Sequence, residues 1–146
     1  MYSNTRHNGF GQEVRARILV GNYVLSAGHA GQFYNNAKKV QRLMSYEFTQ
    51  AFADVDVLIM PVHPAPAFKF GAFSDNKLQL DLQDYFTCAM NLAGIPSLSL
   101  PCGMSTGNLP IGFQVVGPHL SEELLYQVGH AFQQYTDWHT KKPTGY

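Results

Sequence analysis

Charged side chains are scarce in this sequence of 146 residues. Lysine and arginine together number 10, and aspartate and glutamate also number 10. Charged residues therefore make up 14% of the chain, against about 25% in an average soluble domain. The two signs cancel, so no net field attracts nucleic-acid phosphates or an anionic membrane. We expect no nucleic-acid binding by this chain alone, and we expect its weakly charged surface to be partly covered by a partner or by self-association.

Long apolar runs are absent as well. No stretch of about 18 consecutive apolar residues occurs, and residues 1–12 contain no apolar segment, so we expect neither a transmembrane helix nor a signal peptide. The expected location is the cytoplasm, or an organellar matrix in a eukaryote.

Cys88 and Cys102 are too few for a disulfide scaffold and form no C-x-x-C motif, so we predict both to be reduced and buried.

The familiar local signatures of catalysis are missing too. The sequence contains no serine elbow G-x-S-x-G, no phosphate loop G-x-x-x-x-G-K-[ST], no dinucleotide fingerprint G-x-G-x-x-G and no zinc motif H-E-x-x-H. None of the six histidines lies four residues from another, the spacing that places two metal ligands on one helix face. We therefore predict no metal site and no cofactor in this chain.

What the sequence does contain is typical of a packed globular protein. Hydrophobic residues make up 45% of the chain, including 10 phenylalanines and 8 tyrosines. This length suits one domain with one core. Glycine and proline are spread evenly and no repeat occurs, so we predict a single unit over residues 1–146.

Hydrophobic spacing predicts alternating helices and strands. A helical period predicts helices over residues 12–25, 32–53 and 80–93, and a last helix capped by the Ser121 hydroxyl. Short apolar or β-branched runs predict strands over residues 55–60, 97–102 and 110–116. The first should be covered on both faces, and the other two could pair antiparallel. The predicted fold class is α/β, with helices packed on a mixed sheet.

Several short motifs occur in a characteristic order. They are Gly9-Phe10-Gly11-Gln12-Glu13-Val14, Tyr23-Val24-Leu25-Ser26-Ala27-Gly28, Asp56-Val57-Leu58, Asn91-Leu92-Ala93-Gly94-Ile95-Pro96, Pro101-Cys102-Gly103, Leu109-Pro110-Ile111-Gly112-Phe113-Gln114 and Asp137-Trp138-His139. This series resembles the amidase signature family over residues 2–139, and within it the A subunits of glutamyl-tRNA(Gln) amidotransferase. The resemblance implies the C-terminal portion of the amidase signature fold.

The resemblance also implies that the catalytic groups of the family are missing. Family members carry a serine nucleophile, a second serine on a cis peptide bond and a lysine base, all upstream of the region that matches this chain. Met1 then resembles an internal methionine of family members. Ser26, Ser97 and Ser99 lack a glycine-rich turn and an evident base, so no substitute nucleophile is expected. We therefore expect this chain alone to be catalytically inactive.

Arg17 and Asp84 are the candidate substrate-binding residues. By resemblance, they match the positions at which the amidotransferase subunit holds the α-carboxylate and the α-ammonium of glutamine. The residue types suit these roles, because a guanidinium donates two parallel hydrogen bonds to a carboxylate and a carboxylate attracts an ammonium. The alternative interpretation is that both are solvated surface charges.

The complete subunit implied by the resemblance hydrolyses glutamine and sends ammonia to a partner subunit, which converts Glu-tRNA(Gln) into Gln-tRNA(Gln). ATP, magnesium and tRNA are then expected mainly in the partner subunits. Two alternatives stay open. One is part of an amidase for another amide, and the other is a non-catalytic binding or scaffold module.

Overall fold

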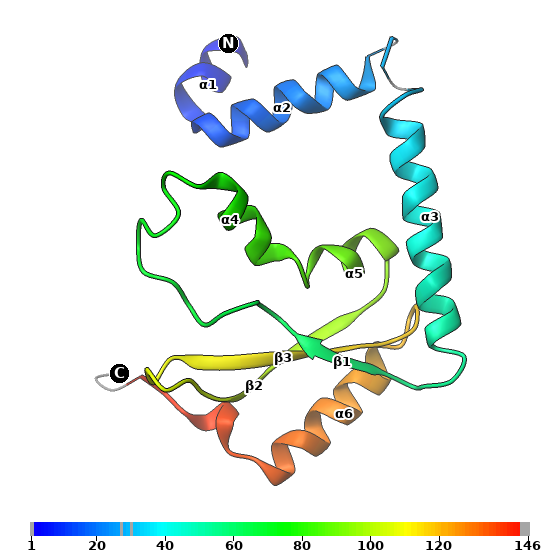
Figure 1. Ribbon diagram of the computed structural model, residues 1–146, viewed down its shortest axis with the longest axis vertical. Helices are drawn as coiled ribbons and strands as arrows, with labels where there is room; N and C mark the ends of the chain where they lie inside the picture. The colour runs from blue at the N-terminus through cyan, green and yellow to red at the C-terminus, as the bar shows by residue number, and fades with distance from the viewer. Residues whose placement is uncertain (1, 27, 30, 144–146) are drawn as a thin grey trace. The chain divides into compact units, whose positions relative to one another are not determined.

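The computed structural model describes residues 2–26, 28–29 and 31–143 (Figure 1). Met1, and Ala27 of the second quoted motif, lie outside the described residues. The chain forms two compact units, Met1–Leu43 and Met44–Tyr146. The sequence led us to expect a single unit over residues 1–146, and that expectation stays a prediction.

The first unit is helical. It contains α1 (Tyr2–Gly9), α2 (Gln12–Leu25) and the beginning of α3 (Tyr34–Ala51). The bounds of α2 are those that the apolar spacing predicted. The long predicted helix over residues 32–53 is confirmed as α3, although its ends are about two residues shorter because helix ends fray.

The second unit is built on a three-stranded sheet in the order β1-β3-β2. The strands are β1 (Leu58–Pro61), β2 (Ser97–Met104) and β3 (Pro110–Val116). The predicted antiparallel pair is confirmed: β2 and β3 form a hairpin whose turn includes Asn108 in a left-handed conformation. β1 also pairs antiparallel with β3, so these described strands form an antiparallel sheet where we predicted a mixed one.

β1 is an edge strand, and the prediction that both of its faces are covered is wrong. Its residues alternate between half-buried and exposed, and the Ile59 side chain is 66% exposed. The apolar run that led to the prediction begins earlier, but Val55 lies outside the strand and is exposed. A run of apolar residues alone does not reveal whether a neighbour covers it.

The predicted helix over residues 80–93 is broken into three pieces. These are α4 (Lys77–Asp81), the 3₁₀ helix η1 (Leu82–Asp84) and α5 (Cys88–Ala93). Gly94 ends α5 in a left-handed conformation at φ 73°, and its N–H donates to the Met90 carbonyl. Between η1 and α5 the chain makes a turn, in which the Phe86 carbonyl accepts a hydrogen bond from the Gln114 side chain of β3.

The last helix, α6 (Glu122–Tyr135), covers one face of the sheet, and α4 and α5 lie on the other side (Figure 1). Leu125 of α6 packs with Leu100 and Val115 in a buried core. Gly129 allows the close approach, because a Cβ there would lie only 2.7 Å from Leu98 Cδ2. Ser121 does not cap α6 with its side chain as predicted, because its hydroxyl donates to the Pro118 carbonyl at 2.7 Å.

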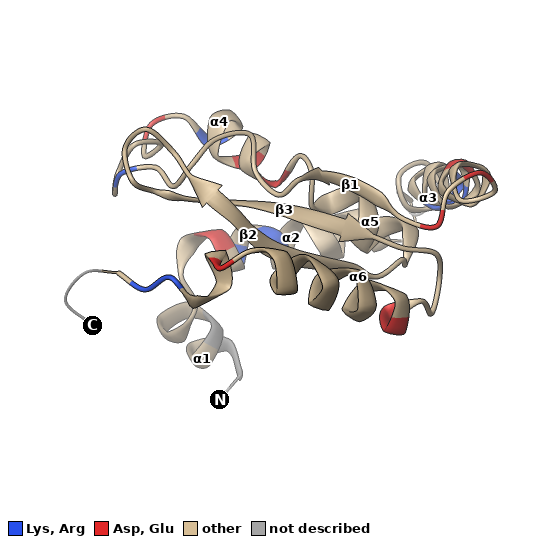
Figure 2. Ribbon diagram, turned by 90° about the horizontal axis from the view of Figure 1, so that it is seen from below, with Lys and Arg blue, Asp and Glu red and all other residues tan. Residues whose placement is uncertain are grey.

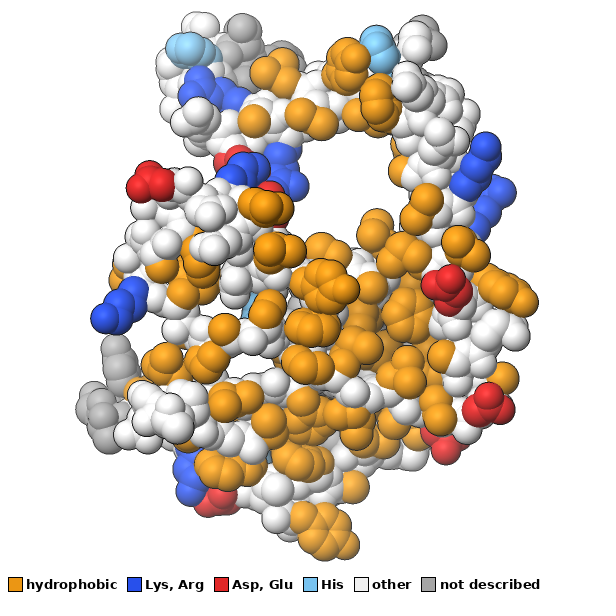
Figure 3. All heavy atoms as spheres, in the orientation of Figure 1, with side chains coloured by type: hydrophobic (Ala, Val, Ile, Leu, Met, Phe, Trp, Pro, Cys, Tyr) orange, Lys and Arg blue, Asp and Glu red, His pale blue; other side chains and the backbone are white. Residues whose placement is uncertain are grey.

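The surface agrees with the low charge content. Most of the ribbon in Figure 2 carries no charged residue, and hydrophobic side chains gather on the face of the second unit seen in Figure 3. Cys88 is exposed and Cys102 half-buried, so the prediction that both are buried is wrong, since α5 buries only Met90. Among the described helices, none is long and apolar enough to cross a membrane.

Candidate functional site

Arg17 lies on α2 in the first unit, with its side chain 73% exposed. Its Nε donates a hydrogen bond of 2.9 Å to Glu13 Oε1, one helical turn earlier. This exposed pair holds the guanidinium only weakly. Arg17 can therefore exchange Glu13 for another carboxylate at small cost.

Asp84 lies at the end of η1 in the second unit and is exposed. Its backbone carbonyl accepts hydrogen bonds from the Thr87 N–H at 3.1 Å and from Thr87 Oγ1 at 3.2 Å. Among the described residues, its carboxylate takes part in no hydrogen bond or ion pair. The structure thus places a solvated carboxylate on a turn in which Thr87 binds the Asp84 carbonyl.

Two side chains from other elements hold the backbone on either side of Asp84. His63, just after β1, bonds through Nδ1 to the Gln83 carbonyl at 2.9 Å. Gln114 of β3 donates from Nε2 to the Phe86 carbonyl at 2.7 Å and to the Pro61 carbonyl at 3.0 Å. Neither contact was predicted from the sequence. A glutamine within the apolar run of β3 was the one signal that could have pointed to Gln114.

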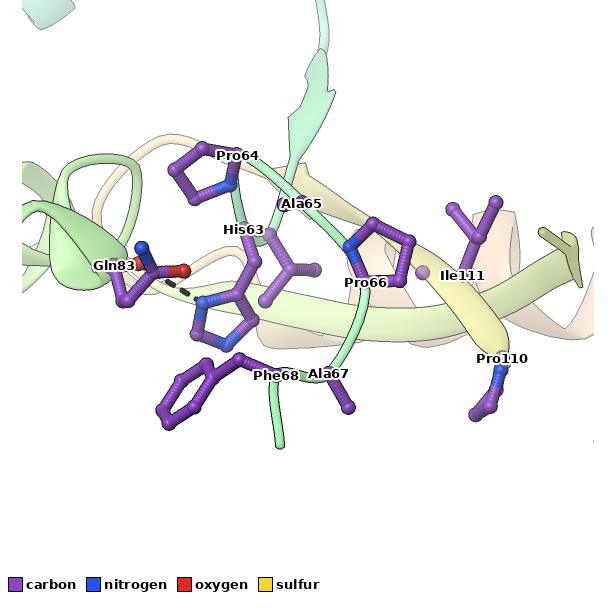
Figure 4. A pocket seen from close by; sticks show the side chains of 11 residues that line it. His63, Pro64, Ala65, Pro66, Ala67, Phe68, Gln83, Pro110 and Ile111 are labelled. Atoms are coloured by element: carbon purple, nitrogen blue, oxygen red, sulfur yellow. Dashed lines mark hydrogen bonds between the residues drawn. The ribbon is translucent and has the colours of Figure 1, made fainter. Parts of the chain in front are cut away.

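A cavity of about 580 Å³ lies beside this segment (Figure 4). Its wall is mostly apolar and comes from the loop after β1, the start of β3 and Gln83. Figure 4 shows the His63 ring between Gln83 and Phe68, with the bond to Gln83 dashed. The loop carries prolines at positions 64 and 66, which make its backbone rigid, and this cavity wall was not predicted from the sequence.

The described part of the chain contains no cluster of metal-binding side chains, and its Ser26 is not activated by the histidine beside it. No group of three or more metal-binding side chains gathers there. Ser26 does have a histidine neighbour, with 3.1 Å from its Oγ to His29 Nδ1. However, the Ser26 hydroxyl donates its proton to the Tyr23 carbonyl at 2.7 Å, so the imidazole donates to Oγ and does not act as a base.

Comparisons with known proteins identify the family. A family model described as Amidase matches residues 1–126. The A subunit of glutamyl-tRNA(Gln) amidotransferase from a Picosynechococcus species is 51% identical over 143 residues, which are 98% of this chain and 30% of that protein. The protein of the same name from Methylococcus capsulatus is 48% identical over 99% of this chain. This chain spans about 30% of the length of these curated relatives.

Solved structures agree with this result. The crystal structure of the glutamyl-tRNA(Gln) amidotransferase A subunit from Thermotoga maritima is 42% identical and superposes with a TM-score of 0.64, over 86% of this chain and 27% of that one. A crystal structure of an amidase superposes with a TM-score of 0.75 at 27% identity, over 90% of this chain and 30% of that one. These matches confirm the α/β fold that the motifs implied, and this chain belongs to the amidase family.

Proposed function

We propose that this chain is the C-terminal part of the glutamine-hydrolysing subunit of an ATP-dependent glutamyl-tRNA(Gln) amidotransferase. The observation that carries the proposal is 51% identity to the A subunit of such an enzyme over 98% of this chain. In the complete enzyme, this subunit releases ammonia from glutamine for the conversion of Glu-tRNA(Gln) into Gln-tRNA(Gln). The present chain contributes the residues that recognise glutamine.

Glutamine differs from a simple amide by the two charges on its α-carbon. In the proposed site, the Arg17 guanidinium binds the α-carboxylate through charge-assisted hydrogen bonds, and the Asp84 carboxylate binds the α-ammonium. Both groups are exposed. To bind the substrate carboxylate, Arg17 has to give up only its weak ion pair with Glu13. Their chemistry therefore fits an amino acid that carries one charge of each sign.

The reaction itself needs groups that this chain does not provide. Ser26, the serine with a histidine beside it, donates its proton to a backbone carbonyl and has no activated oxygen. We propose that a serine and a lysine of the catalytic N-terminal part of the enzyme complete the site. Glutamine recognition by the present chain then aligns the side-chain amide with that serine.

We assign the cofactors and most tRNA contacts to the other subunits of the complex. No cluster of three or more metal-binding side chains occurs among the described residues, and the chain has no net charge to attract tRNA. We propose that ATP and magnesium bind in the partner subunit that activates Glu-tRNA. The proposed location is the cytoplasm, or an organellar matrix in a eukaryote.

A second candidate function is hydrolysis of another amide. The TM-score of 0.75 to an amidase, against 0.64 to the Thermotoga maritima protein, favours keeping it. Under this alternative, Arg17 and Asp84 are solvated surface charges. Their removal then affects glutamine and simple amides alike.

Complementation distinguishes the two functions. The present chain is mixed with the remaining, N-terminal part of a related A subunit, and the mixture, called the assembled enzyme below, is assayed for ammonia release from glutamine and from propionamide. We expect the Asp84→Asn variant to have a higher KM for glutamine than the wild type. Asp81→Asn is the matched control, because Asp81 is an exposed carboxylate three residues earlier that pairs with Lys77 at 3.8 Å. Equal effects of the two variants would support the second function.

A further inference from the structure

Gln114 is the buried polar side chain of the described core, only 1% exposed. It lies on β3 between Phe113 and Val115, whose side chains belong to the α6 face of the sheet. Because neighbouring residues of a strand point to opposite faces, Gln114 points to the face on which α4 and α5 lie. A buried amide on this face is costly unless it is hydrogen-bonded.

The Gln114 amide connects two segments that are distant in sequence. Nε2 carries two hydrogens, and each one has an acceptor: the Pro61 carbonyl at 3.0 Å and the Phe86 carbonyl at 2.7 Å. Pro61 ends β1, and Phe86 lies two residues after Asp84. The bond to Phe86 falls within the break between η1 and α5. Gln114 therefore stabilises the turn that carries Asp84 in place of a continuous helix.

His63 holds the same turn on its other side. Since the Gln83 carbonyl can only accept a hydrogen bond, His63 Nδ1 carries the hydrogen. The backbone is thus fixed one residue before Asp84 by His63 and two residues after it by Gln114. His63 is exposed, whereas Gln114 is buried, so we expect Gln114 to be the stronger of the two contacts.

We propose that Gln114 is a positioning residue for glutamine recognition: it fixes the backbone around Asp84 so that the Asp84 carboxylate meets the α-ammonium of the substrate. This inference rests on the proposed function. Gln114 itself does not touch the substrate. Its removal should therefore weaken the binding of the ammonium and leave the rest of the reaction intact.

The test compares glutamine with 4-carbamoylbutanoate, which has the same amide and carboxylate but no α-amino group. In the assembled enzyme, Gln114→Met keeps a side chain of similar length without N–H donors. We expect KM for glutamine to rise roughly 2- to 12-fold, the factor that corresponds to one hydrogen bond, with kcat little changed. The KM for 4-carbamoylbutanoate should stay the same. The double variant Asp84→Asn/Gln114→Met should be no worse than Asp84→Asn, because Gln114 acts through Asp84.

Val115→Ala is the matched control for a purely structural effect. Val115 is buried on the same strand but faces α6, so its truncation loosens the core without touching the turn at Asp84. It should leave the ratio of the two KM values unchanged. Hydrogen exchange of the isolated chain adds a readout without activity: Gln114→Met should speed exchange of the Thr87 N–H, which bonds to the Asp84 carbonyl.

The outcomes separate the inference from the proposed function. If Asp84→Asn leaves the glutamine KM unchanged, the proposed function fails. If Asp84→Asn raises it but Gln114→Met does not, or raises the KM of both substrates equally, the inference fails. Should Gln114→Met not fold, His63→Ala loosens the same turn from the exposed side. An unchanged ratio of KM values in that variant would also overturn the positioning account.

Discussion

Replacement of Arg17 separates a role in substrate recognition from a role in stability. In the structure, Arg17 is 73% exposed and pairs with Glu13 at 2.9 Å along α2. An exposed pair of this kind contributes about 0.3–0.5 kcal/mol to folding. A charge-assisted hydrogen-bonded pair with the substrate carboxylate contributes roughly 1.5–3 kcal/mol, which is about 10- to 150-fold in affinity. Arg17→Ala should therefore impair glutamine binding with almost no loss of stability.

The assay measures KM and kcat for glutamine in the assembled enzyme, together with the thermal midpoint of the variant chain. We expect the KM for glutamine to rise about 10- to 150-fold in Arg17→Ala. If Arg17 also aligns the amide for attack, kcat falls as well. Arg17→Lys should recover only part of the loss, because an ammonium cannot bond to both carboxylate oxygens as a planar guanidinium does.

Arg15→Ala is the control for Arg17→Ala. Arg15 lies on the same helix, and its Nη1 is 3.5 Å from the His7 carbonyl, so its removal also deletes a positive charge from α2. The recognition account requires wild-type glutamine kinetics in this variant. Equal kinetics in Arg15→Ala and Arg17→Ala, or wild-type kinetics in both, would refute the assignment of Arg17.

Three further predictions concern the chain itself. Leu125→Ala should lower the free energy of unfolding by about 2–5 kcal/mol in urea denaturation, because Leu125 is 3% exposed in the core; a loss below about 1 kcal/mol would contradict this packing. The chain alone should form dimers or larger species in light scattering, because the edge of β1 and exposed apolar side chains such as Ile59 lack a cover within the described structure; a monodisperse monomer would contradict this expectation. The hydrogen bond from Lys141 lowers the pKa of Asp137 below its ordinary value of 3.8. Any stability from this pair is therefore present above pH 3.8 and is lost as the pH falls through the lowered pKa. An NMR titration should show a higher pKa of Asp137 in Lys141→Ala, and an unchanged pKa would contradict this pairing.

Local patterns predicted the parts of the fold that depend on local contacts. The bounds of α2 and β3 match the predicted ranges, because the helical period in one and the bounded apolar run in the other are complete within each segment. The helical pattern predicted over residues 80–93 stops before Gly94, and Gly94 ends α5 with positive φ. These features require no information from distant residues.

The features that the sequence did not predict depend on contacts between distant residues. The turn at Asp84 interrupts a helical pattern because side chains from distant parts of the sequence donate hydrogen bonds to its backbone carbonyls. Gln114 binds the Phe86 carbonyl, 28 residues away, and His63 binds the Gln83 carbonyl, 20 residues away. β1 has an apolar sequence but lies at the edge of the described sheet. Spacing along the chain contains no information on such neighbours.

The candidate site shows the same division. Arg17 and Asp84 were found from a resemblance to a family, since as isolated charges they are no different from solvated surface residues. Gln114 is polar within an apolar strand, which is a local anomaly, yet its acceptors could be named only from the structure. The cavity beside His63 likewise depends on how the loop after β1 folds against Gln83 and the start of β3.

The most direct test of the account is glutamine hydrolysis by the assembled enzyme. The isolated chain should release no ammonia from glutamine, because Ser26, which has a histidine beside it, donates its proton to a backbone carbonyl and is not activated. Addition of the N-terminal part of a related A subunit should restore hydrolysis that prefers glutamine to 4-carbamoylbutanoate and that loses this preference in Asp84→Asn. Turnover by the purified isolated chain, or a restored activity that does not distinguish the two substrates, would contradict the account.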